Sequence, residues 1–401
     1  MLLSNLSPAN VSILESRKAE AFVRYGILVI TFFLLLYSAV TQQAKGDEGG
    51  AYLPAFDQAF SLWPALDLSP YWSISSFYLW VVAALQAVAE SWASGKILVT
   101  GRLLSLGCWL ILVGEQARSG RYKSLAVLFN PYVLIYSVRA HPLLPGLGLF
   151  YLFWILVRRQ KRVGLLILPF AVSFQVFIGG TVGLFMPKFP LQKNEVIRAL
   201  VIGVLALSGV LITWLTWGGM YPPKFASHVF FQEYHVHGKP SFGYLGTVFM
   251  VAGGLFWVIG NRTVEDIKQH RTYSLIVVGL LILAAVLLYK TATIVGIARQ
   301  LSQAALANGQ LGWVISYLLL GLGWLRLHRD HYPLFFGLLG AAVLLVTLPY
   351  LYERISVFAT IAPCLAWCSL QQSEKQQKGL VLTICCVFVL LFIMYQRYGS
   401  L

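Results

Sequence analysis

Two adjacent carboxylates, Asp47 and Glu48, follow closely on the first long apolar run of the chain, residues 25–40. Charge at the mouth of a membrane helix is unfavourable near hydrocarbon, so an ionisable group in such a place is by default a candidate for function. The glycines beside the pair let the backbone turn sharply there. The stretch therefore predicts either an acidic active site at the end of the first helix or an ordinary solvated loop.

Further polar residues stand in the short segments between later apolar runs. Arg139 and His141 occupy the turn after residues 124–138. Lys290 and Arg299 follow the apolar run 272–288, and Arg354 directly precedes the run 355–370. These side chains are either substrate contacts or interfacial anchors, because long basic side chains also reach from a helix end to the membrane surface.

Carboxylates and cations on one face suit transfer of a sugar from a phosphate-linked donor. The reaction needs a base beside the acceptor hydroxyl and positive charge on the departing phosphate. Asp47 is predicted to be that base or to orient the acceptor, with Glu48 in support. The candidates for binding the phosphate are Arg139, His141, Lys290, Arg299 and Arg354. Arginine suits this role better than lysine, because its planar guanidinium can donate two hydrogen bonds to phosphate oxygens.

A divalent metal is the one candidate cofactor. Glu233 and His235 alternate in the loop 218–243, so they would share one face of an extended segment. Glutamate and histidine are ordinary metal ligands, and Glu48 is a third candidate ligand. The alternative is that the loop is simply solvated.

Composition predicts a polytopic all-α membrane protein. The mean hydropathy is +0.73, 58% of residues are hydrophobic and only 11% are charged. Open sheets and irregular backbone cannot face lipid, and no long stretch lacks apolar runs, so residues 1–401 are expected to form a single integral membrane domain. The net charge of +15 is assigned to cytoplasmic anchoring residues rather than to nucleic-acid binding.

The positive-inside rule then fixes a topology. If residues 71–89 crossed the membrane, the basic segments 116–123 and 158–162 would face outward, against the rule. Residues 71–89 are therefore placed in the outer interface, within a long extracytoplasmic loop (42–96) that contains interfacial helices and the acids. Residues 164–186 form either one span or two short helices broken near Gln175 and Gly179-Gly180; the second choice keeps the following cations inside. The result is about thirteen transmembrane helices with a cytoplasmic N-terminus in the cell (inner) membrane.

Several motifs, in order, resemble those of the C-type (GT-C) membrane glycosyltransferases, in particular the protein O-mannosyltransferase and aminoarabinose transferase group. The acidic pair Asp47-Glu48 with Tyr52 is similar to the first-loop motif of that family. Gly101-Arg102 is similar to the start of a family helix that has an arginine at its beginning. The stretch 129–141 is similar to a segment that ends in Arg-Ala-Asp or Arg-Pro-Asp, with His141 in place of the Asp. Residues 230–235 resemble an outer loop that supplies Glu or His, and Gln175 replaces a frequent Lys.

The resemblance implies a polyprenyl-phosphate-linked sugar donor, a lipid, glycan or protein acceptor, catalysis at the outer leaflet, and in some members a divalent metal. It places Tyr52 among the substrate contacts. A polysaccharide polymerase or ligase acting on lipid-linked oligosaccharide is the alternative, and would depend on Arg and His rather than on Asp47. A transporter or flippase is less favoured, because the sequence shows no pseudo-repeat and no charges within mid-membrane helices.

Overall fold

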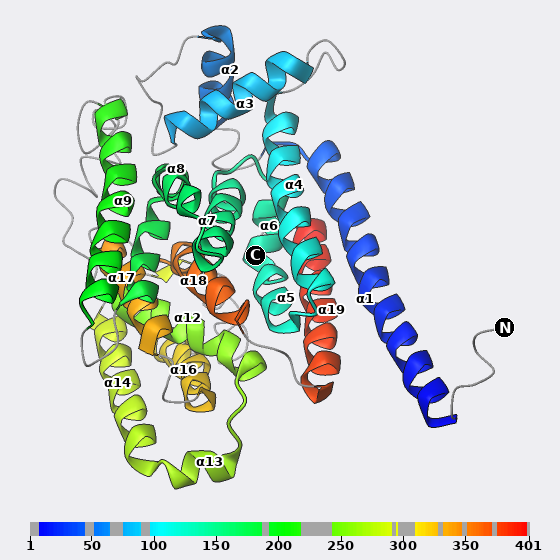
Figure 1. Cartoon of the computed structure of the whole chain (residues 1–401), viewed down its shortest axis with the longest axis vertical. Helices are drawn as coiled ribbons and strands as arrows, with labels where there is room; N and C mark the ends of the chain where they lie inside the picture. Colours follow the sequence, from blue (N-terminus) through cyan, green and yellow to red (C-terminus); the bar gives the residue numbers. More distant parts are fainter. Residues whose placement is uncertain are drawn as a thin grey trace.

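The computed structural model describes residues 8–44, 52–64, 75–89, 97–186, 192–217, 243–290, 294–295, 309–327, 332–346, 351–370 and 375–398. These residues are almost entirely helical, as the apolar runs predict. Figure 1 shows the long helices gathered into one bundle, with two short helices across one end.

The N-terminal half of the chain supplies the following elements: α1 (Pro8–Thr41), α2 (Leu53–Ser61), α3 (Ser76–Ala89), α4 (Ile97–Arg118), α5 (Tyr122–Leu128), α6 (Pro131–Ser137), α7 (Leu143–Arg158), η2 (Arg162–Ile167), α8 (Leu168–Phe174), η3 (Val176–Phe185) and α9 (Lys193–Trp217). The elements named η are wound more tightly, as 3₁₀ helices.

The C-terminal half supplies the rest: α12 (Gly243–Ile259), α13 (Val264–Gln269), α14 (Arg271–Lys290), β1 (Ile294–Val295), α16 (Gly309–Gly321), η5 (Leu322–Arg326), α17 (Tyr332–Val346), β2 (Leu351–Tyr352), α18 (Glu353–Cys368) and α19 (Lys375–Tyr398). The two strands pair in parallel, Ile294 with Leu351 and Val295 with Tyr352.

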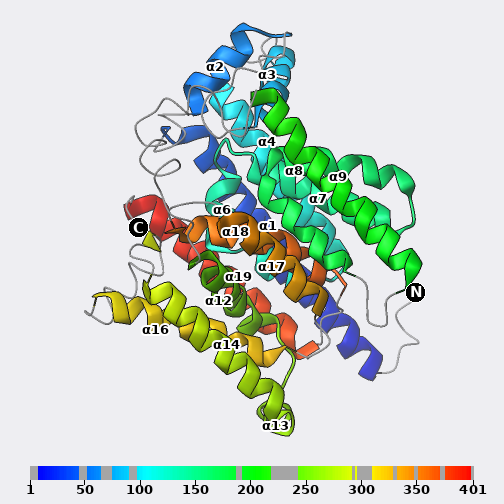
Figure 2. The ribbon, with the colours of Figure 1, turned by 90° about the vertical axis from the view of Figure 1, so that its left-hand side faces the viewer.

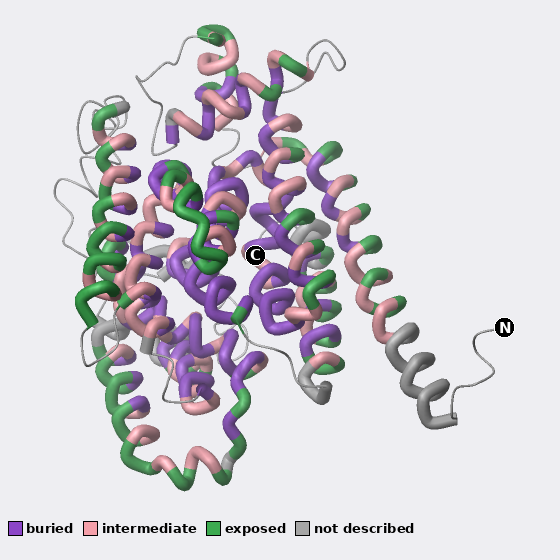
Figure 3. Tube along the Cα trace, viewed as in Figure 1, coloured by how far each residue is buried: buried purple, intermediate pink, exposed green. Residues whose placement is uncertain are grey.

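Within the described part of the chain, three helical segments have both the length and the apolar composition to cross a bilayer: Glu20–Thr41, Ile97–Arg118 and Lys193–Leu215. The other apolar helices are shorter. The outer helices turn large apolar side chains outward, such as Phe22, 81% exposed, and Leu215, 78% exposed. Figure 3 shows this division between buried inner helices and the partly exposed α1, α9 and α14. Apolar surface of this extent is what a helical membrane protein presents to lipid.

The predicted break in the middle of the chain is confirmed at Gln175. This residue adopts an extended backbone between α8 and η3, with φ −148° and ψ 102°. The pair Gly179-Gly180 does not break the helix, contrary to the prediction. Instead, a Cβ on Gly180 would lie 2.2 Å from the backbone nitrogen of Ala341, so the glycine is there because η3 and α17 touch backbone to backbone.

The prediction for residues 124–138 is also corrected. The span predicted over residues 124–138 is two seven-residue helices, α5 and α6. Asn130 separates them: its side chain accepts a hydrogen bond from the Tyr132 N–H at 3.0 Å, and Pro131 takes the first helical position, where its missing donor does no harm. The helix that contains the first apolar run begins well before that run, at Pro8.

The first loop contains helices, as predicted. α2 and α3 pack against each other and against α4 at one end of the bundle, in both Figure 1 and Figure 2. The prediction that this loop lies in the interface is wrong for two of its aromatic side chains, because Phe56 and Tyr78 are fully buried. Their rings meet edge to face at 5.8 Å, and Tyr78 also meets Phe174 of α8 at 5.9 Å. These rings fasten the small α2–α3 layer to the bundle.

Candidate active site

Arg102 fixes the chain where it leaves the first helix. Its side chain is 1% exposed. One terminal nitrogen, Nη1, donates to the carbonyl oxygens of Ala39 at 3.2 Å and Gln42 at 2.7 Å, and the other, Nη2, donates to that of Gln43 at 3.3 Å. The last carbonyls of a helix lack intrahelical partners and carry partial negative charge, so a guanidinium is well suited to them. Arg102 thereby positions the segment that leads to Asp47.

The turn between α6 and α7 packs tightly against the same part of α4. A Cβ on Gly101 would lie 2.8 Å from the Cβ of Ala140, so only glycine allows this approach. The Ser105 hydroxyl donates to the carbonyl oxygens of His141 and Gly101, each at 3.2 Å. Because α4 is rigid, it holds the 138–142 turn and the end of α1 in a fixed relation.

His141 lies at the centre of an aromatic cluster. Its Nδ1 accepts a hydrogen bond from the Leu143 N–H at 3.1 Å, at the start of α7. Its ring centroid lies 4.7 Å from that of Tyr136 and 5.7 Å from those of Tyr52 and Phe358. With Nδ1 accepting, the neutral imidazole carries its proton on Nε2. The ring is therefore held in one orientation by four neighbours.

Arg139 lies two residues before His141 in the same turn. Its guanidinium carbon stands 5.4 Å from the centre of the Tyr136 ring, within the range of a cation–π contact. The side chain is partly exposed. Sequence reasoning assigned Tyr52, Arg139 and His141 to one site. In the structure Tyr52 lies against His141, and both His141 and Arg139 lie against Tyr136.

The C-terminal half reaches this cluster through α18. Phe358 of α18 packs edge to face on Tyr136, with ring centroids 4.6 Å apart. Arg354 lies one helical turn before Phe358 in α18. The pairing of β1 with β2 brings the segment that follows Lys290 alongside the residues directly before Arg354. Phe358 was not predicted, because no local pattern distinguishes it from a core phenylalanine.

Five of the predicted site residues lie outside the described residues: Asp47, Glu48, Glu233, His235 and Arg299. Lys290 and Arg354 stand in helices, at the end of α14 and the start of α18, but their side chains are not described. Among the residues that the structure describes, no three His, Cys, Asp or Glu side chains come together as metal ligands.

The opposite end of the bundle gathers basic segments. Lys378 lies 3.2 Å from Glu20, and Arg24 donates to the Tyr122 hydroxyl at 3.2 Å. Tyr122 in turn donates to Glu20. Burial, and then this hydrogen bond, raise the pKa of Tyr122 to about 12, so the hydroxyl stays protonated as a donor. We call this the basic end; the part of α4 from Arg102 to its last residue, Arg118, separates it from Arg102 by about 24 Å.

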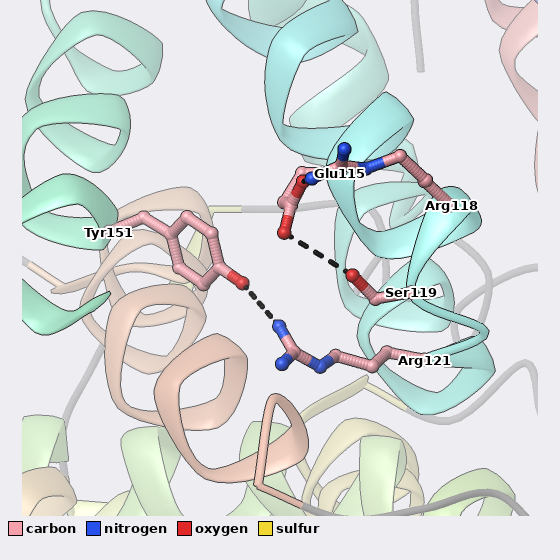
Figure 4. A network of polar contacts seen from close by, with 5 residues as sticks. All are labelled: Glu115, Arg118, Ser119, Arg121 and Tyr151. Atoms are coloured by element: carbon pink, nitrogen blue, oxygen red, sulfur yellow. Dashed lines mark hydrogen bonds and ion pairs between the residues drawn. The ribbon is translucent and has the colours of Figure 1, made fainter. Parts of the chain in front are cut away.

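Figure 4 shows the basic end of α4 in close-up. Glu115 accepts from Arg118 at 2.8 Å and from Ser119 at 3.2 Å, while Arg121 donates to Tyr151 of α7 at 3.0 Å. Elsewhere at this end, Lys123 donates to Asn261 at 2.6 Å. The basic segments around residues 20–24, 118–123, 261–262 and 378 therefore share one end of the molecule, as the predicted topology requires.

No protein-family model, no curated protein and no solved structure matches this chain.

Proposed function

We propose that this chain is a C-type membrane glycosyltransferase that moves a sugar from a polyprenyl-phosphate-linked donor to a lipid, glycan or protein acceptor. The observation that carries the proposal is the cluster of Tyr52, Arg139 and His141 beside the Arg102 clamp. Asp47 lies three residues after Ala44 and five before Tyr52 in the sequence. Both flanking segments contact the same turn or the same end of α4.

In the proposed reaction, Asp47 takes the proton of the acceptor hydroxyl. The acceptor oxygen attacks the anomeric carbon, and the bond from that carbon to the phosphate oxygen breaks with inversion. Polyprenyl phosphate leaves with the bonding electrons, and its growing negative charge is stabilised by cations. Glu48 supports Asp47 or binds a metal ion together with Glu233 and His235.

Arg139, Lys290, Arg299 and Arg354 are the proposed phosphate contacts. The positions of Arg139 and of the paired strands β1 and β2 support this assignment. Arg139 stands in the aromatic cluster, and the β1–β2 pairing joins the segment between Lys290 and Arg299 to the residues just before Arg354. A planar guanidinium can donate two parallel hydrogen bonds to phosphate oxygens, which makes arginine suited to this role.

The proposed setting is the cell (inner) membrane, crossed by about thirteen spans, with the N-terminus and the basic end in the cytoplasm and the cluster on the outer side. The gathering of the basic segments at one end supports this orientation.

Transfer in proteoliposomes tests the proposal. The full chain is supplied with a panel of polyprenyl-phosphate-linked hexoses and pentoses, and release of polyprenyl phosphate is measured. Asp47→Asn should abolish release but still bind polyprenyl phosphate, whereas Arg139→Ala should weaken that binding about tenfold or more. Normal turnover by Asp47→Asn would refute the assignment of the base.

A polysaccharide polymerase or ligase is the second candidate. The observation that favours it is that an arginine and a histidine, Arg139 and His141, are the ionisable residues seen in the described cluster. With a lipid-linked oligosaccharide as both donor and acceptor, this activity would fail in His141→Ala and Arg139→Ala and survive in Asp47→Asn.

Removal of divalent metal separates the two proposed roles of Glu48. If Glu48, Glu233 and His235 hold a metal, chelation should stop transfer and added Mg²⁺ or Mn²⁺ should restore it. Full activity after dialysis against a chelator would leave Glu48 as a support for Asp47 alone.

A further inference from the structure

A recess of about 300 Å³ opens at the basic end, between the end of α7, the start of η2 and the first turns of α9. Three cations line it, Lys161, Arg162 and Arg198, and all three are exposed. Apart from Gln160, the remaining wall is apolar and includes Val157, Leu165 and Val201. The recess therefore combines positive charge at its mouth with a hydrocarbon-like lining.

The backbone places two of these cations. α7 ends in a Schellman turn, in which the Lys161 N–H donates to the Leu156 carbonyl at 2.9 Å and the Gln160 N–H donates to the Val157 carbonyl at 3.1 Å. Gln160 takes the left-handed conformation, φ 58°, that this turn requires. The turn reverses the chain, so Lys161 and Arg162 stand over the recess rather than continuing along α7.

The third cation comes from α9. The Arg198 guanidinium carbon lies 5.7 Å from the centre of the Phe185 ring, and this contact directs the side chain toward η3 and the recess. Glu195, one turn earlier in α9, is the nearest acid in the sequence of that helix. Three cations against one carboxylate leave the mouth of the recess positive.

The apolar wall continues along a surface suited to acyl chains. On either side of Val201, α9 exposes Leu200 at 64% and Val204 at 66%, and the helix is one of the three with the length and composition of a membrane span. A ligand with an anionic head in the recess could extend its chains down this face without leaving apolar surroundings. A free anion would use the cations and leave the apolar wall uncovered.

We propose that this recess binds one anionic phospholipid, with its headgroup phosphate on Lys161, Arg162 and Arg198 and its acyl chains along α9. Charge complementarity and the continuous apolar face carry the choice of occupant. Basic pockets between membrane helices on the cytoplasmic side are suited to such headgroups. The site lies at the opposite end of the bundle from the Tyr52–Arg139–His141 cluster and stands whether or not the proposed sugar transfer is correct.

Native mass spectrometry of the full chain tests the proposal. The protein is released from micelles that contain either phosphatidylglycerol or phosphatidylcholine with the same acyl chains. One phosphatidylglycerol should be retained in preference to phosphatidylcholine. Each cation near an anionic lipid contributes about fivefold in affinity, so K161Q/R162Q/R198Q should reduce the preference on the order of 100-fold.

Two matched controls distinguish binding in the recess from nonspecific attraction of an anionic lipid to positive surface charge. R118Q/K268Q/R271Q removes the same charge from exposed residues outside the recess and should keep the preference. Val201→Trp fills the recess without changing charge and should abolish retention, whereas Ile111→Trp, at a 73% exposed position of α4 outside the recess and away from α9, should not. Equal loss in both triple variants, or retention by Val201→Trp, would overturn the proposal.

Inorganic phosphate distinguishes the lipid from a free anion. Excess phosphate should displace no more phosphatidylglycerol than a chloride solution of equal ionic strength. Displacement beyond the chloride control would assign the recess to free phosphate and refute the lipid as its occupant.

Discussion

At the scale of single residues, His141 explains how a histidine can stand where the resembling family often has an aspartate. Its Nδ1 accepts the Leu143 N–H at the start of α7. An aspartate or asparagine oxygen at the same position can accept that bond as well, since these side chains commonly bond to a backbone N–H two residues on. The shared requirement is an acceptor for a helix-initiating N–H, not an acidic group.

This account predicts different outcomes for two substitutions of His141. His141→Ala removes the acceptor from the first turn of α7 and should lower the free energy of unfolding by about 1 kcal/mol. His141→Asn keeps an acceptor and should recover most of that loss. Thermal unfolding of the purified protein measures both; equal destabilisation by the two variants would show that the ring contacts, not the hydrogen bond, matter for stability.

Arg102 and Arg118 make a matched pair at the two ends of α4. Arg102→Gln leaves the buried Ala39 carbonyl of α1, and the carbonyls of Gln42 and Gln43 just after it, without this donor and should cost about 3 kcal/mol. Arg118, whose side chain is 78% exposed beside Glu115, should tolerate Arg118→Gln within about 0.5 kcal/mol. The same unfolding measurement applies, and similar effects for the two variants would contradict the clamp.

Sequence reasoning found Arg139, His141 and Tyr52 because their motifs follow one another in order along the chain. It did not find the role of Arg102 as a clamp, because that role depends on carbonyls about sixty residues earlier, such as Gln42. Backbone acceptors have no signature in residue types. Phe358 was missed for a similar reason, since its contacts with Tyr136 and His141 are made only once α18 packs.

At the scale of elements, apolar runs located the helices, whereas local chemistry decided where they break. The Asn130-Pro131 pair ends α5 and begins α6, and such a pair is a turn signal that can be read in the sequence. This turn signal was overlooked because it lies within a long apolar run. The break at Gln175 was predicted from the charge pattern on either side, yet the close contact of η3 with α17 could not be, because it requires knowing which two helices meet.

That contact yields a prediction about two neighbouring glycines. A Cβ on Gly180 would meet the Ala341 nitrogen at 2.2 Å and its Cα at 2.3 Å, both backbone atoms, whereas a Cβ on Gly179 has nothing nearer than 3.6 Å. Gly180→Ala should force α17 away and destabilise the protein by about 2 kcal/mol or more. Gly179→Ala should be neutral or stabilise by a few tenths of a kcal/mol. Comparable losses of thermal stability in both variants would argue against backbone contact at Gly180.

At the scale of the whole molecule, the charge pattern of the sequence assigned segments to two sides of the membrane, and the structure places the segments of each side close together. Segments assigned to one side by their charge lie side by side at the basic end, joined by Glu20, Tyr122 and Lys378. Segments assigned to the other side meet around Tyr136. Charge asymmetry is readable from composition because it depends on residue types alone. The burial of Phe56 and Tyr78 was not readable, since an interfacial aromatic and a core aromatic have the same sequence pattern.

The final prediction concerns which end of the bundle faces out. Ser61 of α2 and Ser119 after α4 are both exposed and lie at opposite ends, and serine to cysteine is nearly isosteric. In intact cells, a membrane-impermeant maleimide should label Ser61→Cys but not Ser119→Cys, and both should react after the membrane is opened. The five native cysteines lie in apolar runs, and a background with all of them changed to serine removes their signal. Labelling of Ser119→Cys alone would invert the topology and place the Tyr52–Arg139–His141 cluster in the cytoplasm, where the proposed outer-leaflet transfer could not occur.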